Sequence, residues 1–486
     1  MELRAVISGI DGLKAKGNLD IDIKTIESDS RKVTNGSMFV AIVGFETDGH
    51  KYIKQAIENG ASAIMIQEGA KISKSDITDD ITIIMAPDTR IATAKMACNF
   101  YKNPSTKFKL IGVTGTKGKT TTTFMIKSIL ETQGKKVGLI GTVANYIGDK
   151  NLGESSRTTP DIIELQKLFN QMVEENVDAV IMEVSSQALK LHRVDGCEFD
   201  IGVFTNFSED HISPNEHPDM EDYFKSKLKL MQMCKVGYIN SDDFKVSKIK
   251  KLLPEKDIKS YGIDNETDLL AKDITITNSS VDFKVKIEGK NERVKTGIPG
   301  RFSVYNSLAA ISVCAKLGAN AEQIKEALLN VRVPGRSELV DNKKGLTIMI
   351  DYAHSPESLQ SILSAVKSYT RGKVISVFGC GGDRDRTKRP IMGQISANTA
   401  DFTIITSDNP RTEEPEKIIE EIEVGAKKSR GKYITIVNRT EAIKYAIEMA
   451  TKNDMIVLAG KGHETYQEIN GVKHHYDERE IIKEVI

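Results

Sequence analysis

The sequence has little cysteine, and no pattern in the little that it has. The five cysteines form no CxxC pair and no spacing typical of zinc ligands. This excludes a disulfide scaffold or a cysteine-based zinc module and is typical of reduced thiols in a cytosolic protein. They are Cys98, Cys197, Cys234, Cys314 and Cys380.

Long apolar runs, an excess of charge and internal repeats are also lacking. No stretch approaches the ~18 consecutive apolar residues of a membrane-spanning helix. The first residues lack the charged region, apolar run and cleavage site of a signal peptide, so we expect a cytoplasmic protein, and we expect it to act as a monomer. Lys plus Arg and Asp plus Glu are both 68, which gives no reason to expect a nucleic-acid or membrane partner but allows a local basic pocket.

What the sequence does have is a series of short apolar, β-branched runs. Stretches of helical spacing, such as TTTFMIKSILETQ and EKIIEEIEVGAKK, lie between many of them. Alternation of this kind predicts an α/β protein with parallel sheets. The runs are FKLIGV, KVGLIG, DAVIMEV, DIGVFTN, VGYIN, LTIMID, KVISVFG, FTIITS, YITIVN and MIVLAG.

The length of 486 residues predicts three domains, at ~100–200 residues each. We expect a small N-terminal α/β domain over 1–107, in which DGHKYIKQAIENGASAIMI forms a helix ended by Gly60 and then a strand. A central mononucleotide-binding domain with a phosphate loop should cover 108–334. The Pro-Gly break in VRVPGRSEL then begins a C-terminal Rossmann-like domain over 335–486.

Seven of the apolar runs end abruptly in a polar or glycine-rich string. Ligands of open parallel sheets bind beyond the carboxyl ends of the strands. One such string would be ordinary loop chemistry, whereas seven over two sheets predict two facing active-site edges and a site between domains. The strings are TGTKGKT, SSQ, FSEDH, DYAHSP, CGGDRDRTKRP, SDNPRTEEP and GKGHETYQ.

The first string predicts a phosphate-binding loop. Glycines let backbone amides converge on phosphate oxygens, the following helix N-terminus adds partial positive charge, and Lys119 can bridge the terminal phosphates. Thr120 offers a hydroxyl for Mg²⁺. Val113 stands where a strict GxxxxGK[ST] loop begins with glycine, so a glycine-rich turn that caps a helix is the alternative. The nucleotide-binding residues predicted here are Gly115, Thr116, Lys117, Gly118, Lys119, Thr120 and Thr121.

Glu183 ends a predicted buried strand in the same domain. A carboxylate at this place could hold Mg²⁺, directly or through water. From the residue alone, an ordinary charge at a strand end is an equal alternative.

These strings, taken together, resemble the Mur ligase family. GTKGKTTT, EVSS, TNFSEDH and YFKSK resemble its central domain, and DYAH, GCGGDRD, SDNPR and GKGHE its C-terminal domain. DSR and DGH near the start resemble the N-terminal domain of the branch that adds the third residue of the peptidoglycan stem. The resemblance covers essentially the whole chain, with the motifs in the family's order.

The resemblance implies an ATP- and Mg²⁺-dependent amide ligase. ATP phosphorylates the γ-carboxylate of D-Glu in UDP-MurNAc-L-Ala-D-Glu, and an incoming amine attacks the acyl phosphate. The tetrahedral intermediate collapses to amide, ADP and phosphate. The physical difficulty is to bring a carboxylate to a triphosphate, which positioned cations overcome.

The family's functional residues can be placed on matching positions. Lys119, His211 and Lys227 are implied to be catalytic, and Thr120, Glu183, His211 and Lys227 to be Mg²⁺ ligands. Lys227 matches a lysine that the family carbamylates: its neutral amine captures CO₂, and the resulting anion orients a second Mg²⁺. Without the resemblance, SKLKLM would be a helix with a solvated basic face.

Further matches concern ATP and the nucleotide sugar. Asn306 resembles the residue that reads adenine, although it could be a polar residue on an apolar helix. Arg336 and Asp351 resemble ATP contacts from the third domain, and such an Arg would couple domain closure to catalysis. The UDP-sugar is expected between the first two domains, where Thr158-Thr159-Pro160 could equally be a polar turn. The matching positions are Ser30, Thr158, Thr159, Ser185 and Arg193.

Asp408-Asn409-Pro410-Arg411 resembles the motif of enzymes that add meso-diaminopimelate. This amino acid carries a second amino-acid head, whose carboxylate an arginine can bind with two hydrogen bonds. Lysine would leave that arginine unpaired. The alternative for Arg411 is a loop arginine bonded to a neighbour such as Glu413 or Glu414.

Other contacts to the distal head match Arg384, Gly460 and Glu464, of which Glu464 would pair with its ammonium. One departure from the family is ISPNEHPDMEDY after Asp210-His211, which is longer than usual and leaves Glu216 and His217 unassigned. A Mur-like or folylpolyglutamate-like ligase that uses lysine or another amino acid therefore stays open. A non-catalytic nucleotide-binding paralogue is the third hypothesis.

Overall fold

A computed structural model describes residues 1–44, 47–73, 77–78, 80–153, 155, 157–213 and 216–486. The chain forms two compact units. The first contains residues 1–119 and 133–261, and the second contains 120–132 and 262–486. Among the described residues, no helix combines the length and the apolar character needed to cross a membrane. The five cysteines are buried and form no disulfide.

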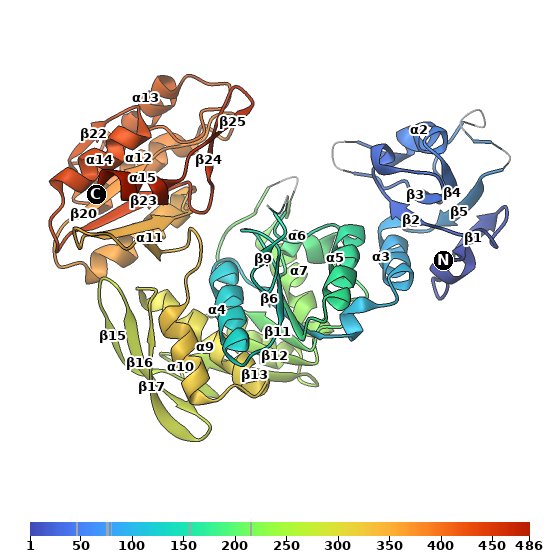
Figure 1. Cartoon of the computed structure of the whole chain (residues 1–486), viewed down its shortest axis with the longest axis horizontal. Coiled ribbons are helices and arrows are strands. Elements are labelled where there is room, and N and C mark those ends of the chain that lie inside the picture. Colours follow the sequence, from blue (N-terminus) through green and yellow to red (C-terminus); the bar gives the residue numbers. More distant parts are fainter. Residues whose placement is uncertain (45–46, 74–76, 79, 154, 156, 214–215) are drawn as a thin grey trace. The chain divides into compact units, whose positions relative to one another are not determined.

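The N-terminal part of the first unit is an α/β layer (Figure 1). Its sheet has the order β1-β5-β4-β3-β2, with β1 antiparallel and the other pairs parallel. As predicted, a helix ends just before Gly60 and a strand follows. The elements are α1 (Leu3–Val6), β1 (Lys14–Lys16), β2 (Thr25–Glu27), β3 (Ser37–Val40), α2 (Ile53–Glu58), β4 (Ala61–Gln67), β5 (Thr82–Ala86) and α3 (Thr89–Phe100).

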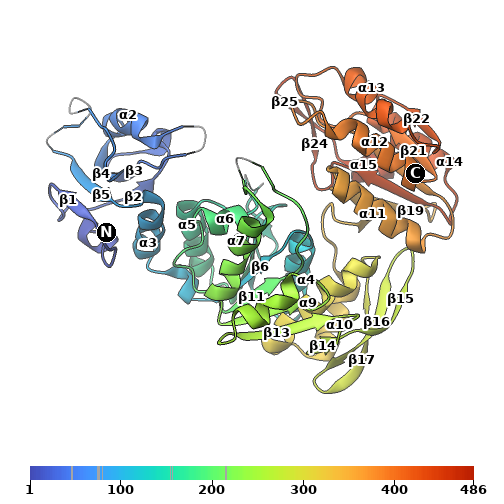
Figure 2. The same ribbon diagram turned by 180° about the vertical axis from the view of Figure 1, so that it is seen from behind.

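The rest of the first unit is built on a larger sheet, whose strands from this unit have the order β13-β12-β11-β6-β10-β7-β8-β9. The helices α5, α6 and α7 lie together on one of its faces (Figure 2), where Met172 of α5 packs against Gly138 and Leu230 of α7 packs against Gly112. The elements are β6 (Lys109–Thr114), α4 (Lys119–Thr132, which continues into the second unit), β7 (Val137–Ile140), β8 (Tyr146–Ile147), β9 (Lys150–Asn151), α5 (Ile162–Glu174), β10 (Ala179–Glu183), α6 (Ser186–Lys190), β11 (Ile201–Phe204), α7 (Met220–Met233), β12 (Val236–Asn240), α8 (Ile249–Leu252) and β13 (Asp257–Gly262).

Local sequence explains these elements. Every residue of β10 is buried, because it pairs in parallel with β6 on one side and β7 on the other. The helix α5 buries Ile162, Leu165, Phe169 and Met172, which recur at the three- and four-residue spacing of one helix face. The carboxyl ends of β10, β6 and β11 lie in register, so the polar strings that follow them meet at one edge of the sheet.

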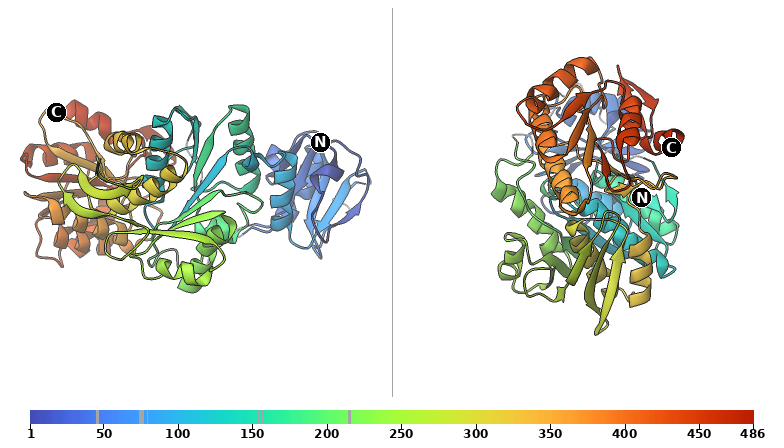
Figure 3. Two further views of the ribbon diagram at one scale, coloured as in Figure 1. Left: turned by 90° about the horizontal axis from the view of Figure 1, so that it is seen from below. Right: turned by 90° about the vertical axis from the view of Figure 1, so that its left-hand side faces the viewer.

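The second unit begins with β14 (Leu269–Leu270), an antiparallel sheet and two helices. The sheet contains β15 (Lys272–Ile276), β16 (Val281–Ile287) and β17 (Lys290–Thr296), drawn in yellow-green in Figure 3. The helices are α9 (Arg301–Lys316) and α10 (Ala321–Asn330). Asn320 and Gln323 form a capping box at the start of α10.

The C-terminal part is a sheet with the order β18-β19-β23-β20-β21-β22, in which only β18 runs antiparallel among the described strands. Its elements are β18 (Glu338–Leu339), β19 (Thr347–Asp351), α11 (Pro356–Tyr369), β20 (Val374–Phe378), α12 (Lys388–Thr399), β21 (Phe402–Ile405), α13 (Pro415–Ala426), β22 (Tyr433–Thr435), α14 (Arg439–Met449), β23 (Met455–Ala459), β24 (Tyr466–Ile469), β25 (Val472–His475) and α15 (Glu478–Val485).

The ten predicted strands and the two predicted helices are therefore confirmed. In the C-terminal sheet, Asp351 pairs with Ala459, Ala459 with Phe378, and Phe378 with Ile405. Four polar strings consequently leave one edge of this sheet together. The predicted boundaries at 107 and 334 stay predictions.

Buried ion pairs hold this edge of the C-terminal part. Arg439 and Glu478 are almost fully buried, and Nε of Arg439 donates to Glu478 Oε1 at 2.8 Å. Arg439 also donates through Nη2 to the carbonyl oxygen of Ala459, the last residue of β23, at 3.0 Å. The pair thus ties α14 and α15 to the strand end that precedes GKGHE.

We predict that Glu478→Gln lowers the free energy of unfolding by about 3–5 kcal/mol, because it leaves a buried guanidinium without its counter-charge. Lys444→Ala, which breaks an exposed pair with Glu441, should cost at most about 1 kcal/mol. Denaturant unfolding of the two variants measures the difference. Equal, small effects would show that the buried guanidinium of Arg439 does not need this counter-charge.

Candidate active site

The loop predicted to bind phosphate, called the phosphate loop below, lies between β6 and α4, where the sequence places it. Gly115 has φ +146°, and a Cβ at this position would lie 1.9 Å from Thr205 Oγ1. Gly118 has φ +83°. The positive φ at both positions and the close packing at Gly115 favour glycine in the turn that precedes Lys119.

The loop is held by two residues that sequence reasoning did not select. Thr205 Oγ1 donates to the carbonyl oxygen of Lys117 at 2.7 Å. Asn206 Nδ2 donates to the same oxygen at 2.9 Å, and Asn206 Oδ1 accepts from the Lys117 amide at 2.9 Å. The sequence did contain a signal for these two residues, because they end VFTN, one of the apolar runs that are followed by a polar string.

Two lysine side chains meet at one carbonyl group. The Nζ atoms of Lys119 and Lys227 each donate to Gly115 O at 2.9 Å. Lys227 is 1% exposed, so the alternative of a solvated basic face is wrong for this residue, although Lys225 on the same helix is exposed. Burial, helped by the charge of Lys119, holds the pKa of Lys227 well below its ordinary value.

Glu183 lies buried at the end of β10 and is oriented by the loop after β7. Its Oε1 accepts from the Thr142 amide at 2.9 Å, and its Oε2 accepts from Thr142 Oγ1 at 3.2 Å. A Cβ at Gly141 would lie 2.4 Å from Glu183 Oε1. The carboxylate can take this position only because residue 141 is glycine.

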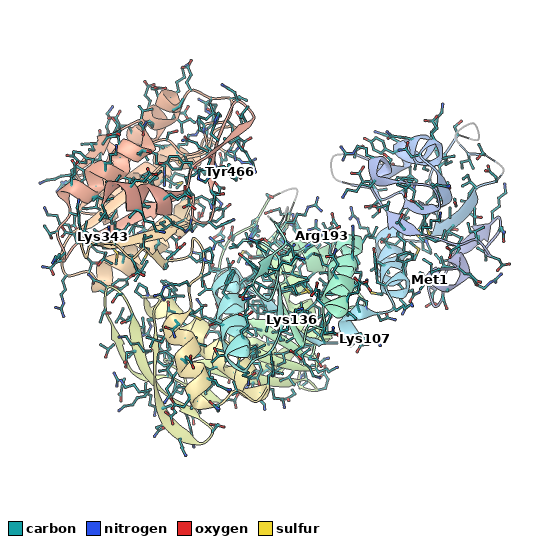
Figure 4. All side chains as sticks on the ribbon, viewed as in Figure 1. Met1, Lys107, Lys136, Arg193, Lys343 and Tyr466 are labelled. Atoms are coloured by element: carbon teal, nitrogen blue, oxygen red, sulfur yellow. The ribbon has the colours of Figure 1, made fainter. Side chains whose placement is uncertain are left out.

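A cavity of about 270 Å³ brings many of the predicted residues together. Arg193, labelled in Figure 4, lies in its wall and forms an ion pair with Asp161 at 2.9 Å. Burial lowers the pKa of Arg193. The predicted residues that line the cavity are Lys119, Thr158, Thr159, Ser185, Arg193, His211 and Lys227, and those not predicted are Arg157, Ser186, Gln187 and Glu216.

The Thr158-Thr159 turn is tied to the strand end that carries Glu183. Thr159 Oγ1 donates to Glu183 O at 2.9 Å and accepts from the Ser185 amide at 3.0 Å. Thr158 Oγ1 lies 3.0 Å from Thr142 Oγ1. Ser185 caps α6 by accepting from the Ala188 amide at 3.1 Å. These hydroxyls are thus part of a rigid polar wall.

The unusual ISPNEHP segment contributes to the cavity, although Pro214 and Asn215 lie outside the described residues. Glu216 Oε2 lies 3.1 Å from His211 Nδ1. His217 is fully buried and bridges Asp222, at 2.6 Å through Nδ1, and Ser186, at 2.9 Å through Nε2. Both unassigned residues therefore have partners at the site.

The predicted Mg²⁺ ligands do not form a complete ligand cluster by themselves. Among the residues that the structure describes, no three His, Cys, Asp or Glu side chains are grouped to hold a metal. Glu183 and Thr120 offer oxygen donors, which Mg²⁺ prefers, and a carbamate on Lys227 would add more. The donor chemistry therefore fits Mg²⁺.

Ser30 lies elsewhere, in the N-terminal part, and does not line the cavity. Its Oγ donates to Gln55 Oε1 at 2.8 Å, and its carbonyl oxygen accepts from Asn59 Nδ2. Asp29 caps the short turn that begins at Ser30, and it also pairs with Arg31.

In the second unit, the residues predicted to contact ATP form two small groups. Thr120 and Thr121 are buried in the first turn of α4, and Asn306 is buried on α9, where its Oδ1 accepts from Thr122 Oγ1 at 3.4 Å. Asn306 thus makes a polar contact on a helix whose other buried residues are apolar or serine.

The other group is Arg336 with Asp351. The guanidinium lies over the Tyr352 ring at 4.6 Å, and the carboxylate accepts from the Ser337 and Ala353 amides at 2.8 and 3.0 Å. Burial raises the pKa of Asp351, and the Arg336 charge opposes this effect.

Arg411 lies in a left-handed backbone conformation, with φ +51°. Its Nε donates to Glu468 Oε2 at 3.0 Å, and its Nη1 donates to Gly382 O at 2.8 Å. Pairing with Glu413 or Glu414 is therefore wrong, because Glu413 pairs with the buried Arg389 instead.

The remaining predicted contacts to the amino acid lie around Arg411. Asn409 Nδ2 donates to Glu464 Oε2 at 2.8 Å. Gly460 has φ +116°, and a Cβ there would lie 2.6 Å from Asp408 Oδ2. Pro410 is buried in the same loop, whereas Arg384 is exposed.

Comparison with known proteins places these features in a family. The Mur ligase family catalytic domain matches residues 22–101, the Mur ligase middle domain matches 113–314, and the Mur ligase glutamate ligase domain matches 335–462. The predicted three-domain α/β organisation is thereby confirmed.

Relatives match over the whole chain. UDP-N-acetylmuramoyl-L-alanyl-D-glutamate--2,6-diaminopimelate ligases from Caldanaerobacter subterraneus subsp. tengcongensis and from Clostridium botulinum are each 46% identical, over 100% of this chain and 99% of theirs. A solved structure of a ligase of the same name has a TM-score of 0.73 and 29% identity, covering 100% of this chain and 98% of its own. The chain belongs to the Mur ligase family.

Proposed function

We propose that this chain is the ATP-dependent ligase that adds meso-2,6-diaminopimelate to the D-Glu γ-carboxylate of UDP-MurNAc-L-Ala-D-Glu. The carboxylate takes the γ-phosphoryl group of ATP and releases ADP, and the substrate amine then attacks the acyl carbon and displaces phosphate. The observation that carries the proposal is the clustering of Asn409, Arg411 and Glu464 in a chain that matches diaminopimelate ligases from end to end.

The central difficulty of the reaction is that two anions, the substrate carboxylate and the triphosphate of ATP, must approach each other. Residues of this chain can offset the repulsion between them. Lys119, at the start of α4, supplies a fixed cation beside the phosphate loop. The loop amides and the helix N-terminus add partial positive charge. Because these groups are already in place, they stabilise charge on the transferred phosphoryl group without reorganising.

Thr120, Glu183, His211 and Lys227 are the residues proposed to hold Mg²⁺, which neutralises phosphate charge when bound. Lys227 suits carbamylation because burial favours its neutral amine. The amine nitrogen bonds to the carbon of CO₂ and loses a proton, so a neutral side chain becomes an anionic oxygen donor beside Lys119.

The amino acid is recognised through its far end. Arg411 is proposed to bind the distal carboxylate and Glu464 the distal ammonium. Lysine has the ammonium but not the carboxylate, so it would leave Arg411 without its substrate partner. Hydrogen bonds to Gly382 and Glu468 hold the Arg411 side chain in place.

The reaction itself can be tested by phosphate release from ATP, Mg²⁺ and UDP-MurNAc-L-Ala-D-Glu. We expect strong turnover with meso-diaminopimelate and little with L-lysine. Equal turnover with lysine would keep the ligase and discard the specificity. No turnover with either would favour a ligase for another substrate or a non-catalytic paralogue.

Lys227→Ala should lower turnover on the order of 100-fold or more, as expected for loss of a charged group at the reacting phosphate. Added bicarbonate should not restore it. The wild-type enzyme in CO₂-depleted buffer should lose activity and recover it with bicarbonate, and ¹³C-bicarbonate should give a carbamate NMR signal.

Lys225→Ala, on the exposed face of the same helix, is the matched control and should leave turnover unchanged. Full activity of Lys227→Ala would contradict the carbamate role.

Arg411→Ala should raise the KM for diaminopimelate about 10- to 150-fold, which corresponds to the ~1.5–3 kcal/mol of a charged hydrogen bond. The KM for ATP should stay the same. Glu468→Gln keeps the arginine and removes only its ion pair, so it should have a much smaller effect. If Arg411→Ala weakens both substrates equally, the arginine supports the fold and not the amino acid.

A further inference from the structure

A fully buried lysine in the C-terminal part has no role in the function proposed so far. Lys461 lies in GKGHE between two glycines, and its side chain is 0% exposed. Gly460 and Gly462 have φ +116° and +58°. A Cβ at Gly462 would lie 2.6 Å from Tyr352 Cβ. The backbone on both sides of Lys461 is therefore fixed by close packing.

The ammonium of Lys461 lies among the residues proposed to bind the amino acid. Its Nζ is 3.1 Å from Asn409 Oδ1, 3.4 Å from Glu464 Oε2 and 3.5 Å from Asp408 Oδ1. One cation is thus shared by two carboxylates, and the three charged groups together carry one net negative charge. A cluster with one net negative charge attracts one further cation, such as an ammonium group.

The two oxygens of Glu464 are not equivalent. Oε2 accepts from both Asn409 Nδ2, at 2.8 Å, and Lys461 Nζ. Within the described part of the chain, Oε1 accepts no hydrogen bond. The side chain keeps 18% of its surface exposed, so a ligand can reach the carboxylate. Lys461 and Asn409 therefore fix one oxygen and leave the other available.

The charge of Lys461 also favours the ionised form of Glu464. Burial and the neighbouring Asp408 raise the pKa of Glu464, whereas Lys461 lowers it. Two carboxyl groups that share a site without a cation tend to keep one proton between them. A protonated Glu464 would offer no negative charge to a substrate ammonium.

We propose that Lys461 is a positioning residue for the distal ammonium of the amino-acid substrate. It binds Glu464 through Oε2 and presents Oε1 to that ammonium, so that the site distinguishes a diamino acid from one with a single amino group. This inference rests on the proposed function, and it adds Lys461 to the residues that determine specificity.

The test compares meso-diaminopimelate with 2-aminopimelate, which has the same carbon chain and both carboxylates but lacks the second amino group. For the wild-type enzyme, kcat/KM should favour diaminopimelate strongly. Lys461→Met should lower kcat/KM for diaminopimelate on the order of 10- to 100-fold, the effect of one charged hydrogen bond, mainly through KM. Activity with 2-aminopimelate and the KM for ATP should change little.

A double-mutant cycle with Glu464→Gln adds a second readout. Because Lys461 acts through Glu464, Lys461→Met should have little further effect in the Glu464→Gln background. Lys473→Met is the control, since Lys473 lies over the Tyr466 ring but outside the cluster, and it should keep wild-type discrimination.

Unchanged discrimination in Lys461→Met, or equal loss with both amino acids, would overturn the proposal. If this variant does not fold, Lys461→Gln is measured in the same way, and failure of both to fold would assign Lys461 to stability alone. Absence of turnover by the wild-type enzyme would instead reject the proposed function, so the two failures are distinguishable.

Discussion

The carbonyl oxygen of Gly115 accepts hydrogen bonds from Lys119 and Lys227, and the chemistry of the first unit depends on this shared contact. Two ammonium groups on one oxygen would repel each other, and burial adds to the cost of charging Lys227. Burial, together with the charge of Lys119, holds the pKa of Lys227 well below its ordinary value. The proposed roles of the two side chains, a cation for phosphate and an amine that captures CO₂, both rest on this arrangement.

The glycine that makes this contact is itself held from outside the loop. Thr205 packs where a Cβ of Gly115 would be, and Asn206 hydrogen bonds to Lys117 from both ends of its side-chain amide. The conformation of the loop that follows β6 therefore depends on Thr205 and Asn206, which follow β11. Glu183 is fixed in the same manner by Gly141 and Thr142 from the neighbouring strand, so the polar edge is preorganised by strand pairing.

In the C-terminal part, buried ion pairs hold the charged side chains of the loops in fixed positions. Arg439 pairs with Glu478, Arg389 pairs with Glu413 and Glu421, and Lys461 lies between Asp408 and Glu464. Buried pairs of this kind add little net stability, but breaking one is costly, so they restrict the loops to one arrangement. Recognition of a zwitterionic substrate head needs such fixed charges.

The sequence by itself determined the α/β class, the succession of strands and helices along the chain, the glycine-rich turn between β6 and α4, and the family. These follow from local patterns: apolar β-branched runs, helical spacing, and glycines next to Lys119. It did not determine which polar residues lie together. The contacts of Lys227 with Gly115, of Arg411 with Glu468, of Asn206 with Lys117 and of Lys461 with Asn409 all join residues that are far apart in the sequence. Only the tertiary structure decided these contacts, because strand order and burial set the distances between residues that are far apart in the chain.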